Sequence, residues 1–257
     1  MEKLTIIKVG GKVVENEKSL QLLLNDFVKI KGKKILVHGG GKTATEISAK
    51  LGIETKMVEG RRITDAETLN VVTMVYAGLV NKNVVAKLQA LQCNALGICG
   101  ADLNIIRAVK RPAKPIDYGF VGDIVEVNSK QFITLLNNDI MPVIAPLTHD
   151  CNGQLLNTNA DTMAQAIAIA LSKEYDVDLI YCFEKKGVLS NADDENSVIP
   201  LIDKKIFEDY KVKKIITEGM IPKLDNGFNA LTQGVKKVII TNAQMLGHAN
   251  SGTILTL

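Results

Sequence analysis

The stretch L-T-I-I-K-V-G-G, from Leu4 to Gly11, is apolar on both faces apart from Lys8 and ends in a glycine pair. Short apolar runs of this kind are typical of parallel strands that are buried in a sheet. The pattern returns in five more runs bounded by Gly, Asn or Pro, at residues 34–37, 95–99, 141–145, 179–183 and 235–241. These six runs predict a central, mainly parallel sheet.

Longer amphipathic segments with the apolar spacing of helices separate these runs. They cover residues 19–31, 42–51, 65–91, 161–172 and 224–234. The alternation predicts an α/β fold, a three-layer αβα sandwich in which helices cover both faces of the sheet. Residues 104–127 depart from the alternation and predict a hairpin that projects from the sheet, and residues 154–156 fit a second hairpin.

The composition is that of an ordinary globular protein. The 257 residues are 46% hydrophobic and 23% charged, which suffices for one large or two modest domains. A net charge of +3, scattered basic residues and few aromatic residues argue against nucleic-acid binding. The sequence shows no signal peptide, no membrane-spanning run and no paired cysteine spacing. We therefore expect a cytoplasmic protein with reduced thiols that binds neither nucleic acid nor membranes.

Two glycine-rich turns follow predicted strands. Gly10 and Gly11 follow the first strand, and residues 39–41, G-G-G, follow the second strand and precede a helix near Lys42. Bare backbone N–H groups beside a helix N-terminus bind anions, and open α/β sheets bind ligands at the carboxyl ends of their strands. The string G-K-T is not a P-loop, because that motif would require glycine at Leu36. The two turns together predict an anion site.

Three further strings extend the pattern along the chain: V-H-G-G-G at 37–41, N-T-N-A-D at 157–161 and G-M-I-P-K at 219–223. Together with Lys8 and its glycine pair, they resemble the amino-acid kinase family, and within it the kinases of N-acylglutamates. The resemblance runs from Leu4 to the string G-T-I at 252–254. It implies the amino-acid kinase fold and ATP-dependent phosphorylation of the γ-carboxylate of an N-acyl-L-glutamate, a step of arginine biosynthesis.

Phosphoryl transfer to a carboxylate needs no general base, because the nucleophile is already ionised at neutral pH. The catalytic task is to position two anions and neutralise the charge between them, which lysine side chains can do. The resemblance implies that Lys8 and Lys223 stabilise the transferred phosphoryl group from opposite sides and that Asp161 orients both. Asp161 also fits a structural role, as the cap of the helix that follows N-T-N-A-D.

The resemblance also implies an acceptor site. Arg62 would bind the α-carboxylate through its planar guanidinium, a pairing that arginine makes better than lysine. Asn157 and Asn159 would contact the α-carboxylate and the acylamino group. The backbone of Gly40 and Gly41 would meet the reacting carboxyl group and the migrating phosphoryl group.

The nucleotide half departs from the family pattern. Where an aspartate is usual, the string C-F-E-K-K-G-V-L at 182–189 has Glu184 and two lysines. The resemblance implies that ATP contacts Gly10, Gly11, Glu184, Gly187, Leu189, Ile215 and Thr217. The sequence offers no clustered metal ligands, so we expect Mg²⁺ to be held mainly by the phosphates. We expect His38 to pack in the glycine turn rather than to act in catalysis.

We expect two lobes, residues 1–160 for acyl-amino-acid binding and dimerisation and residues 161–257 for ATP binding. The first strand begins by residue 4, without the extra N-terminal helix of arginine-inhibited hexameric relatives, so we expect a homodimer without arginine feedback. Two other functions stay open. One is a related kinase acting on aspartate, glutamate, carbamate or a nucleoside monophosphate, and the other is a non-catalytic ligand-binding protein on the same fold.

The acyl group of the acceptor also stays open. Arg61 stands where the family usually has an apolar residue that lines the acetyl pocket. If Arg61 faces solvent, the acceptor is expected to be N-acetyl-L-glutamate. If it faces the pocket, N-succinyl-L-glutamate would supply a carboxylate for its buried charge.

Overall fold

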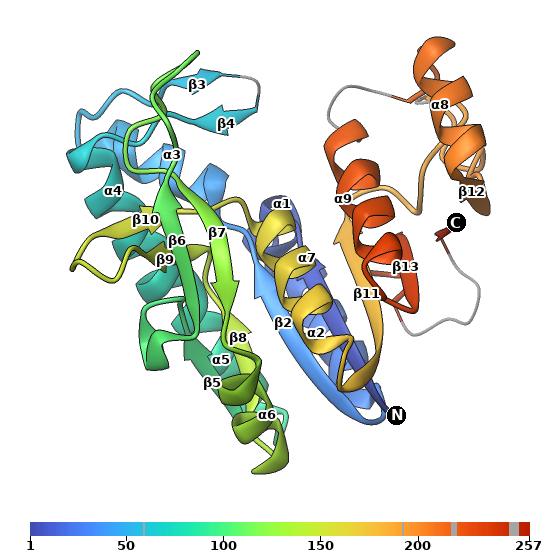
Figure 1. Ribbon diagram of the computed structural model, residues 1–257, viewed down its shortest axis with the longest axis horizontal. Coiled ribbons are helices and arrows are strands. Elements are labelled where there is room, and N and C mark those ends of the chain that lie inside the picture. The colour runs from blue at the N-terminus through green and yellow to red at the C-terminus, as the bar shows by residue number, and fades with distance from the viewer. Residues whose placement is uncertain (59, 192, 217–219, 247–251) are drawn as a thin grey trace.

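The computed structural model describes residues 1–58, 60–191, 193–216, 220–246 and 252–257, and these residues form the predicted three-layer αβα sandwich (Figure 1). The central sheet has eight strands in its described part. In spatial order they are β12 (Leu201–Asp203), β14 (Thr253–Thr256), β13 (Lys237–Asn242), β11 (Tyr175–Phe183), β1 (Glu2–Val9), β2 (Lys33–His38), β8 (Met141–Ile144) and β5 (Ala95–Ile98). Neighbouring strands pair in parallel except β13 and β14, so the sheet is mainly parallel, as predicted.

Strand β1 lies in the middle of the sheet, between β11 and β2. Because side chains alternate along a strand, Leu4 and Ile6 enter the core on one face, whereas Ile7 and Val9 enter the core on the other. Lys8 shares the face of Leu4 and Ile6. This alternation directs a charged side chain toward the helices of that face, at the carboxyl end of the strand.

Helices cover both faces of the sheet (Figure 1). The face of Ile7 is covered by α1 (Gly11–Glu15), α2 (Glu17–Lys29) and α5 (Asn81–Ala90), which bury Phe27 and Leu88. The opposite face is covered by α6 (Ser129–Asn137), α7 (Ala160–Leu171), α8 (Lys204–Val212) and α9 (Ile221–Thr232), which bury Met163 and Phe228. Each layer thus has its own apolar core.

A second, four-stranded sheet contains both predicted hairpins. Its strands, in spatial order, are β10 (Leu155–Asn157), β9 (Leu147–His149), β6 (Ile106–Lys110) and β7 (Gly122–Val127). The pairs β6–β7 and β9–β10 are antiparallel. Beside this sheet lie α3 (Gly41–Lys50), α4 (Ala66–Thr73), the short 3₁₀ turn η2 (Asp102–Asn104) and a small hairpin of β3 (Met57–Val58) and β4 (Arg61–Arg62).

The predicted helix at residues 65–91 is continuous but not uniform. Asp65 caps its start by accepting a hydrogen bond from Thr68 N at 2.8 Å, and α4 then passes into the π-helix η1 (Met74–Val80) before α5. A π-helical turn shifts the buried stripe by about one residue, which apolar spacing alone does not predict. Helices α6 and α8 and strands β12 and β14, which are short or largely polar, were not predicted from the sequence. Among the described residues, no helix combines the length and the apolarity that a membrane crossing requires.

His38 packs in the glycine turn, as expected, and is fully buried. Its Nδ1 lies 2.8 Å from the Gly39 carbonyl oxygen, and its Nε2 lies 3.1 Å from the Asn81 side-chain nitrogen, which also donates to Val143 O. Burial lowers the pKa of His38 to about 4. The neutral ring, donating from Nδ1 and accepting at Nε2, therefore joins β2 to α5.

The buried ring makes stability depend on pH. The unfolded chain binds a proton at a pKa near 6.5, whereas the folded ring does so only at about 4, so stability falls as pH falls between these values. We expect wild type to lose roughly 2 kcal/mol of unfolding free energy between pH 7 and pH 5, a range in which ordinary carboxylates stay ionised. Urea titrations at both pH values measure this loss. His38→Gln should show a smaller loss, and equal losses in both proteins would exclude His38 as the cause.

Candidate active site

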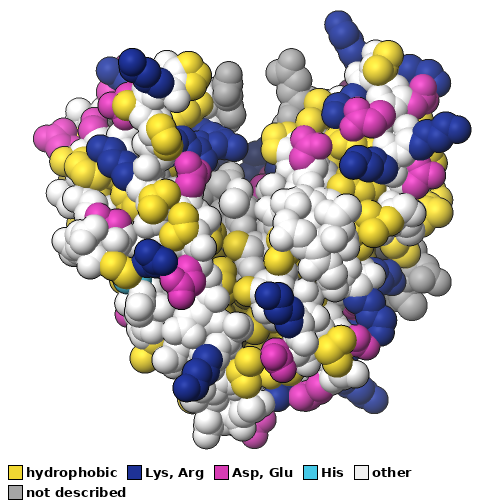
Figure 2. All heavy atoms as spheres, in the orientation of Figure 1, with side chains coloured by type: hydrophobic (Ala, Val, Ile, Leu, Met, Phe, Trp, Pro, Cys, Tyr) yellow, Lys and Arg dark blue, Asp and Glu magenta, His cyan; other side chains and the backbone are white. Residues whose placement is uncertain are grey.

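Two cavities open at the end of the molecule where β1, β2 and β11 end. Figure 2 shows a hollow there, between the part of the chain that carries α3 and α4 and the part that carries α9, and Lys and Arg side chains lie along one wall. The first cavity measures about 250 Å³. Of the predicted site residues, it brings together Lys8, Gly11, Gly40, Gly41, Arg62, Asn157 and Asn159. The second measures about 130 Å³ and is lined by the predicted residues Gly187, Leu189 and Ile215.

One buried carboxylate joins the two lysines from opposite ends of the chain. Lys8 Nζ lies 2.7 Å from one oxygen of Asp161, and Lys223 Nζ lies 3.6 Å from the other. Burial alone would raise the pKa of Asp161, but the two lysine charges outweigh this effect and hold the pKa below its ordinary value. Asp161 is therefore ionised at neutral pH. A single negative charge between two positive ones leaves a net positive charge at the cavity.

The start of α7 positions Asp161. Asn159, and not Asp161, is the N-cap: its side-chain oxygen accepts hydrogen bonds from the backbone N–H groups of Asp161 and Thr162, at 2.9 and 3.0 Å. The alternative in which Asp161 caps the helix is therefore wrong, because Asp161 lies in the first helical turn and its side chain faces the lysines. The cap also occupies the side-chain oxygen of Asn159, so its amide nitrogen is the group left for a ligand.

The two glycine turns pack directly against each other. A Cβ atom at Gly39 would lie 3.1 Å from the backbone nitrogen of Gly11, so a side chain there would push the turns apart. Gly40 is the N-cap of α3 and offers no capping side chain. In the described part of the chain, the N–H groups of Gly40 and Gly41 have no hydrogen-bond acceptor. These groups, at the positive end of the α3 dipole, can bind an anion in the first cavity.

Glu15 supplies the cap that the glycines lack. Its Oε1 accepts hydrogen bonds from the backbone N–H and the hydroxyl of Thr43, at 2.8 and 3.1 Å. Thr43 is the third residue of α3, so this bond satisfies a deeper N–H group and leaves those of Gly40 and Gly41, which line the cavity, without an acceptor among the described residues. Sequence reasoning missed this role, because Glu15 is 28 residues from Thr43 and belongs to another helix.

Arg62 is buried and held by neutral groups. Its guanidinium donates to Gly41 O at 2.7 Å and to the hydroxyls of Thr45 and Thr55, at 2.8 and 3.1 Å. Its side chain makes no ion pair within the described residues. Asn157 lies at the end of β10, where its amide donates to Thr64 Oγ1 at 3.0 Å. A buried cation without a carboxylate partner is a strong candidate for binding an anionic ligand.

Only some of the residues predicted to contact ATP line the second cavity. Gly187, Leu189 and Ile215 line the second cavity, together with Val188, Ile216 and Met220. Glu184 does not line either cavity; its carboxylate lies 3.6 Å from Lys12 Nζ, and both side chains are exposed. Gly10 belongs to the turn after β1, where its N–H donates to Cys182 O at 2.8 Å. Thr217 lies outside the described residues.

Among the residues that line the first cavity and that sequence reasoning missed are Tyr76, Arg111 and Asp123. Tyr76 comes from the π-helix η1, and a Cβ at Gly40 would lie 3.0 Å from its ring. Arg111 and Asp123 pair across the β6–β7 hairpin, where the guanidinium donates to both carboxylate oxygens. For Arg111 and Asp123 the sequence did offer a signal, since they are opposite charges on a predicted hairpin. It did not show the strand register that places them opposite each other.

Comparisons with known proteins agree with this geometry. Residues 3–242 match the model of a family described as the amino acid kinase family. Curated proteins named acetylglutamate kinase, from Parabacteroides distasonis and Bacteroides thetaiotaomicron, are each 60% identical to this chain; the alignments cover 98% of this chain and 99% and 98% of those proteins. The crystal structure of smu.665 from Streptococcus mutans is 26% identical, with a TM-score of 0.83 over 98% of both chains. On the strength of the family match and these near-full-length relatives, the chain belongs to the amino acid kinase family.

Proposed function

We propose that this chain is an acetylglutamate kinase, which transfers the γ-phosphoryl group of ATP to the γ-carboxylate of an N-acyl-L-glutamate in arginine biosynthesis. The observation that carries the proposal is the Lys8–Asp161–Lys223 network beside a polar cavity that also contains Arg62. The 60% identity to proteins named acetylglutamate kinase over nearly their whole length supports the acceptor.

The chemistry needs positioning and charge rather than a base. A γ-carboxylate oxygen attacks the γ-phosphorus of ATP, the bond from that phosphorus to the bridging oxygen breaks, and ADP leaves with the electron pair. No proton moves. Because negative charge spreads over the transferred group in this step, Lys8 and Lys223 would stabilise it from their places on β1 and α9. Asp161 would hold both ammonium groups in position.

The first cavity would bind the acceptor. Arg62 would bind its α-carboxylate, since the guanidinium is already fixed by neutral partners and has no competing carboxylate. The N–H groups of Gly40 and Gly41 would contact the reacting carboxyl and phosphoryl groups. Asn157 and the amide nitrogen of Asn159 would contact the remaining polar groups of the acceptor.

The second cavity would bind the nucleotide. Its lining of Leu189, Ile215 and Gly187 is suited to the flat face of a base. The turn at Gly10 and Gly11, of which Gly11 lines the first cavity, would lie toward the phosphates. The described residues contain no group of three or more His, Cys, Asp or Glu side chains arranged to hold a metal ion. The Mg²⁺ that accompanies ATP would be held mainly by the phosphates, whose charge it would neutralise. Glu184, which is exposed and outside the cavity lining, would act at the rim.

The two cavities support the proposal that the two halves of the chain bind different substrates. Residues 1–160 carry the glycine turns, Arg62 and Asn157 and would form the acceptor lobe. Residues 161–257 carry the lining of the second cavity and Lys223 and would form the ATP lobe. Measuring ADP release with N-acetyl-L-glutamate, L-glutamate, L-aspartate and carbamate in parallel tests the proposal: release with an N-acylglutamate supports it, and release only with another acceptor contradicts it.

The two lysines are expected to act on the chemical step. If each stabilises charge that develops in the transition state, Lys8→Ala or Lys223→Ala should lower kcat by about a hundredfold or more while changing the acceptor KM less. Lys3→Ala is the matched control, because Lys3 lies on the same strand but pairs with Asp178 at an exposed site. Circular dichroism confirms folding. Near-wild-type turnover in either site variant would exclude that lysine from the transition state.

Arg62 is expected to act on binding. Arg62→Lys keeps the charge but loses the planar guanidinium, so the acceptor KM should rise by about tenfold while kcat falls less. The KM for ATP should stay the same. Arg107→Lys, a change of an exposed arginine that pairs with Glu126 on the β6–β7 hairpin, serves as control. An unchanged acceptor KM in Arg62→Lys would remove this residue from the acceptor site.

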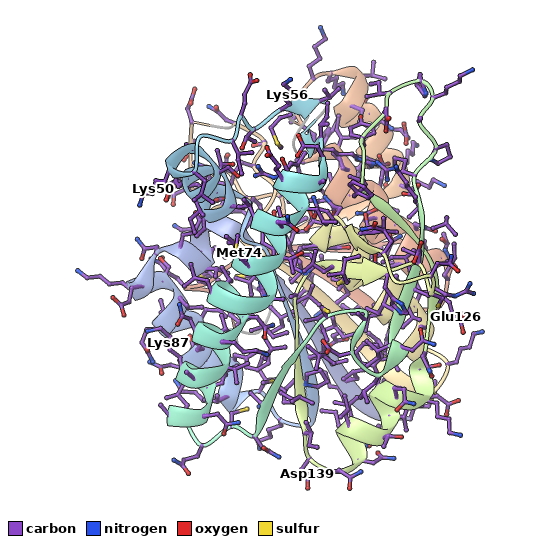
Figure 3. The ribbon with its side chains drawn as sticks, turned by 90° about the vertical axis from the view of Figure 1, so that its left-hand side faces the viewer. Lys50, Lys56, Met74, Lys87, Glu126 and Asp139 are labelled. Carbon is purple, nitrogen blue, oxygen red and sulfur yellow. The ribbon has the colours of Figure 1, made fainter. Side chains whose placement is uncertain are left out.

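The proposal includes a cytoplasmic homodimer. Exposed apolar side chains lie on the α4–η1–α5 helix and on the edge strand β5, at Met74, Leu79 and Leu96. Figure 3 shows Met74 on the outer surface of this helix, about midway along it. Apolar side chains exposed at a sheet edge and along a neighbouring helix would be covered by a second copy of the chain.

Light scattering tests the homodimer. Wild type should have twice the mass of one chain, and Met74→Glu should shift the mass toward that of one chain, because a charge in the interface would lack a partner. Val212→Glu, which replaces an exposed valine on α8, should leave the mass unchanged. A wild-type mass equal to one chain would contradict the homodimer.

A further inference from the structure

The first cavity contains more positive charge than an N-acetylglutamate would use. Its lining includes four basic side chains, Lys8, Arg61, Arg62 and Arg111, and one acidic side chain, Asp123. N-acetylglutamate has two carboxylates. In the proposed function, Arg62 binds the α-carboxylate, and the γ-carboxylate accepts the phosphoryl group beside Lys8. Arg61 and Arg111 are therefore left without a function.

Arg61 lies at the rim of the cavity. It precedes Arg62 in β4, and its side chain is exposed but still among the residues that line the cavity. Within the described part of the chain, it makes no ion pair and no side-chain hydrogen bond. An arginine at this place can turn toward a ligand without breaking an existing bond.

Arg111 is more restrained. It follows β6, its side chain is 20% exposed, and its Nε and Nη2 donate to the carboxylate of Asp123. Its guanidinium also lies over the ring of Tyr118, at 5.4 Å from the centroid. Nη1 has no acceptor in the described residues, so one edge of the planar group remains available for a second carboxylate.

Both arginines belong to the acceptor side. They come from β4 and from the β6–β7 hairpin, whereas the second cavity is lined by residues 185–189, 215, 216 and 220. The nucleotide base would therefore contact the residues of the second cavity and not Arg61 or Arg111. Charge at this place can instead act on the part of the acceptor that lies beyond the α-carboxylate, which is the acyl group.

We propose that the acyl group of the natural acceptor ends in its own carboxylate, as in N-succinyl-L-glutamate, and that Arg61 and Arg111 bind this third carboxylate. The inference rests on the proposed function, because it concerns the same site and the same reaction. An acetyl group ends in a methyl group and offers neither arginine an opposite charge, whereas a terminal carboxylate would form an ion pair and charge-assisted hydrogen bonds with both. Arg61 and Arg111 are therefore residues that determine specificity, and Lys8 and Lys223 carry the chemistry unchanged.

The test compares kcat/KM for three acceptors at saturating ATP: N-acetyl-L-glutamate, N-succinyl-L-glutamate and N-succinamoyl-L-glutamate. The last has the length of the succinyl compound but a neutral terminal amide. Charge-assisted hydrogen bonds should make wild type prefer the succinyl compound over both others by roughly tenfold to a hundredfold. The preference should appear mainly in KM, because the third carboxylate is remote from the reacting atoms.

Two variants remove the proposed charges. Arg61→Gln changes an exposed side chain, and the double variant Arg111→Gln with Asp123→Asn removes the ion pair without leaving an unpaired carboxylate. Each should reduce the preference for the succinyl compound by about tenfold and leave kcat/KM for the acetyl compound nearly unchanged. Lys56→Gln is the control for the first variant. Arg107→Gln with Glu126→Gln, a similar pair on the same hairpin outside the cavity lining, is the control for the second.

The outcomes separate this inference from the proposed function. If wild type phosphorylates the acetyl compound better than the succinyl compound, the inference fails and the proposed function stands. If the succinyl preference survives in both site variants, the assignment to Arg61 and Arg111 fails. If none of the three acceptors is phosphorylated, the proposed function itself fails, and the inference fails with it.

Discussion

The buried carboxylate of Asp161 is the constraint on which the site depends. Removing a carboxylate from water costs several kcal/mol unless cations and hydrogen bonds replace the lost hydration. Lys8 and Lys223 supply the cations, from a strand at one end of the chain and a helix near the other. The ionised carboxylate thus ties β1, α7 and α9 together at one point. Because one negative charge meets two positive ones, the same contact leaves the site prepared for a polyanion.

The architecture could be predicted from the sequence wherever apolar runs were long. The run Leu4–Val9 predicts a buried strand, and Lys8 stands out in it as the one charged residue. Strands β12 and β14 have only three and four residues, and Leu201 is half exposed, so neither gave a clear signal. The π-helical turns of η1 were not predictable, because they continue the apolar spacing of the α-helices on either side and no residue type in Met74–Val80 marks the change.

Within the site, the sequence identified residues that are close together in one short motif. It did not identify pairs that are brought together only by the pairing of two strands. Asn159 and Asp161 share one string, although the sequence could not show which of them caps α7. Arg111 and Asp123 meet across a hairpin whose register shifts between Arg107 and Ala108. Such a shift changes which side chains lie opposite each other, and a single sequence does not reveal it.

The central place of β1 bears on how the chain folds during synthesis. One edge of β1 pairs with β2, which follows closely, but the other edge pairs with β11, and Glu2 lies opposite Tyr175. At a synthesis rate of roughly 5–20 residues per second, β11 leaves the ribosome roughly ten to thirty seconds after β1. During that interval the nascent chain carries an apolar strand with one unpaired edge, a known template for aggregation. The pairing of β1 with β11 at the middle of the sheet is therefore a late step. A chain truncated to its N-terminal half would keep an unpaired strand edge that is prone to aggregation.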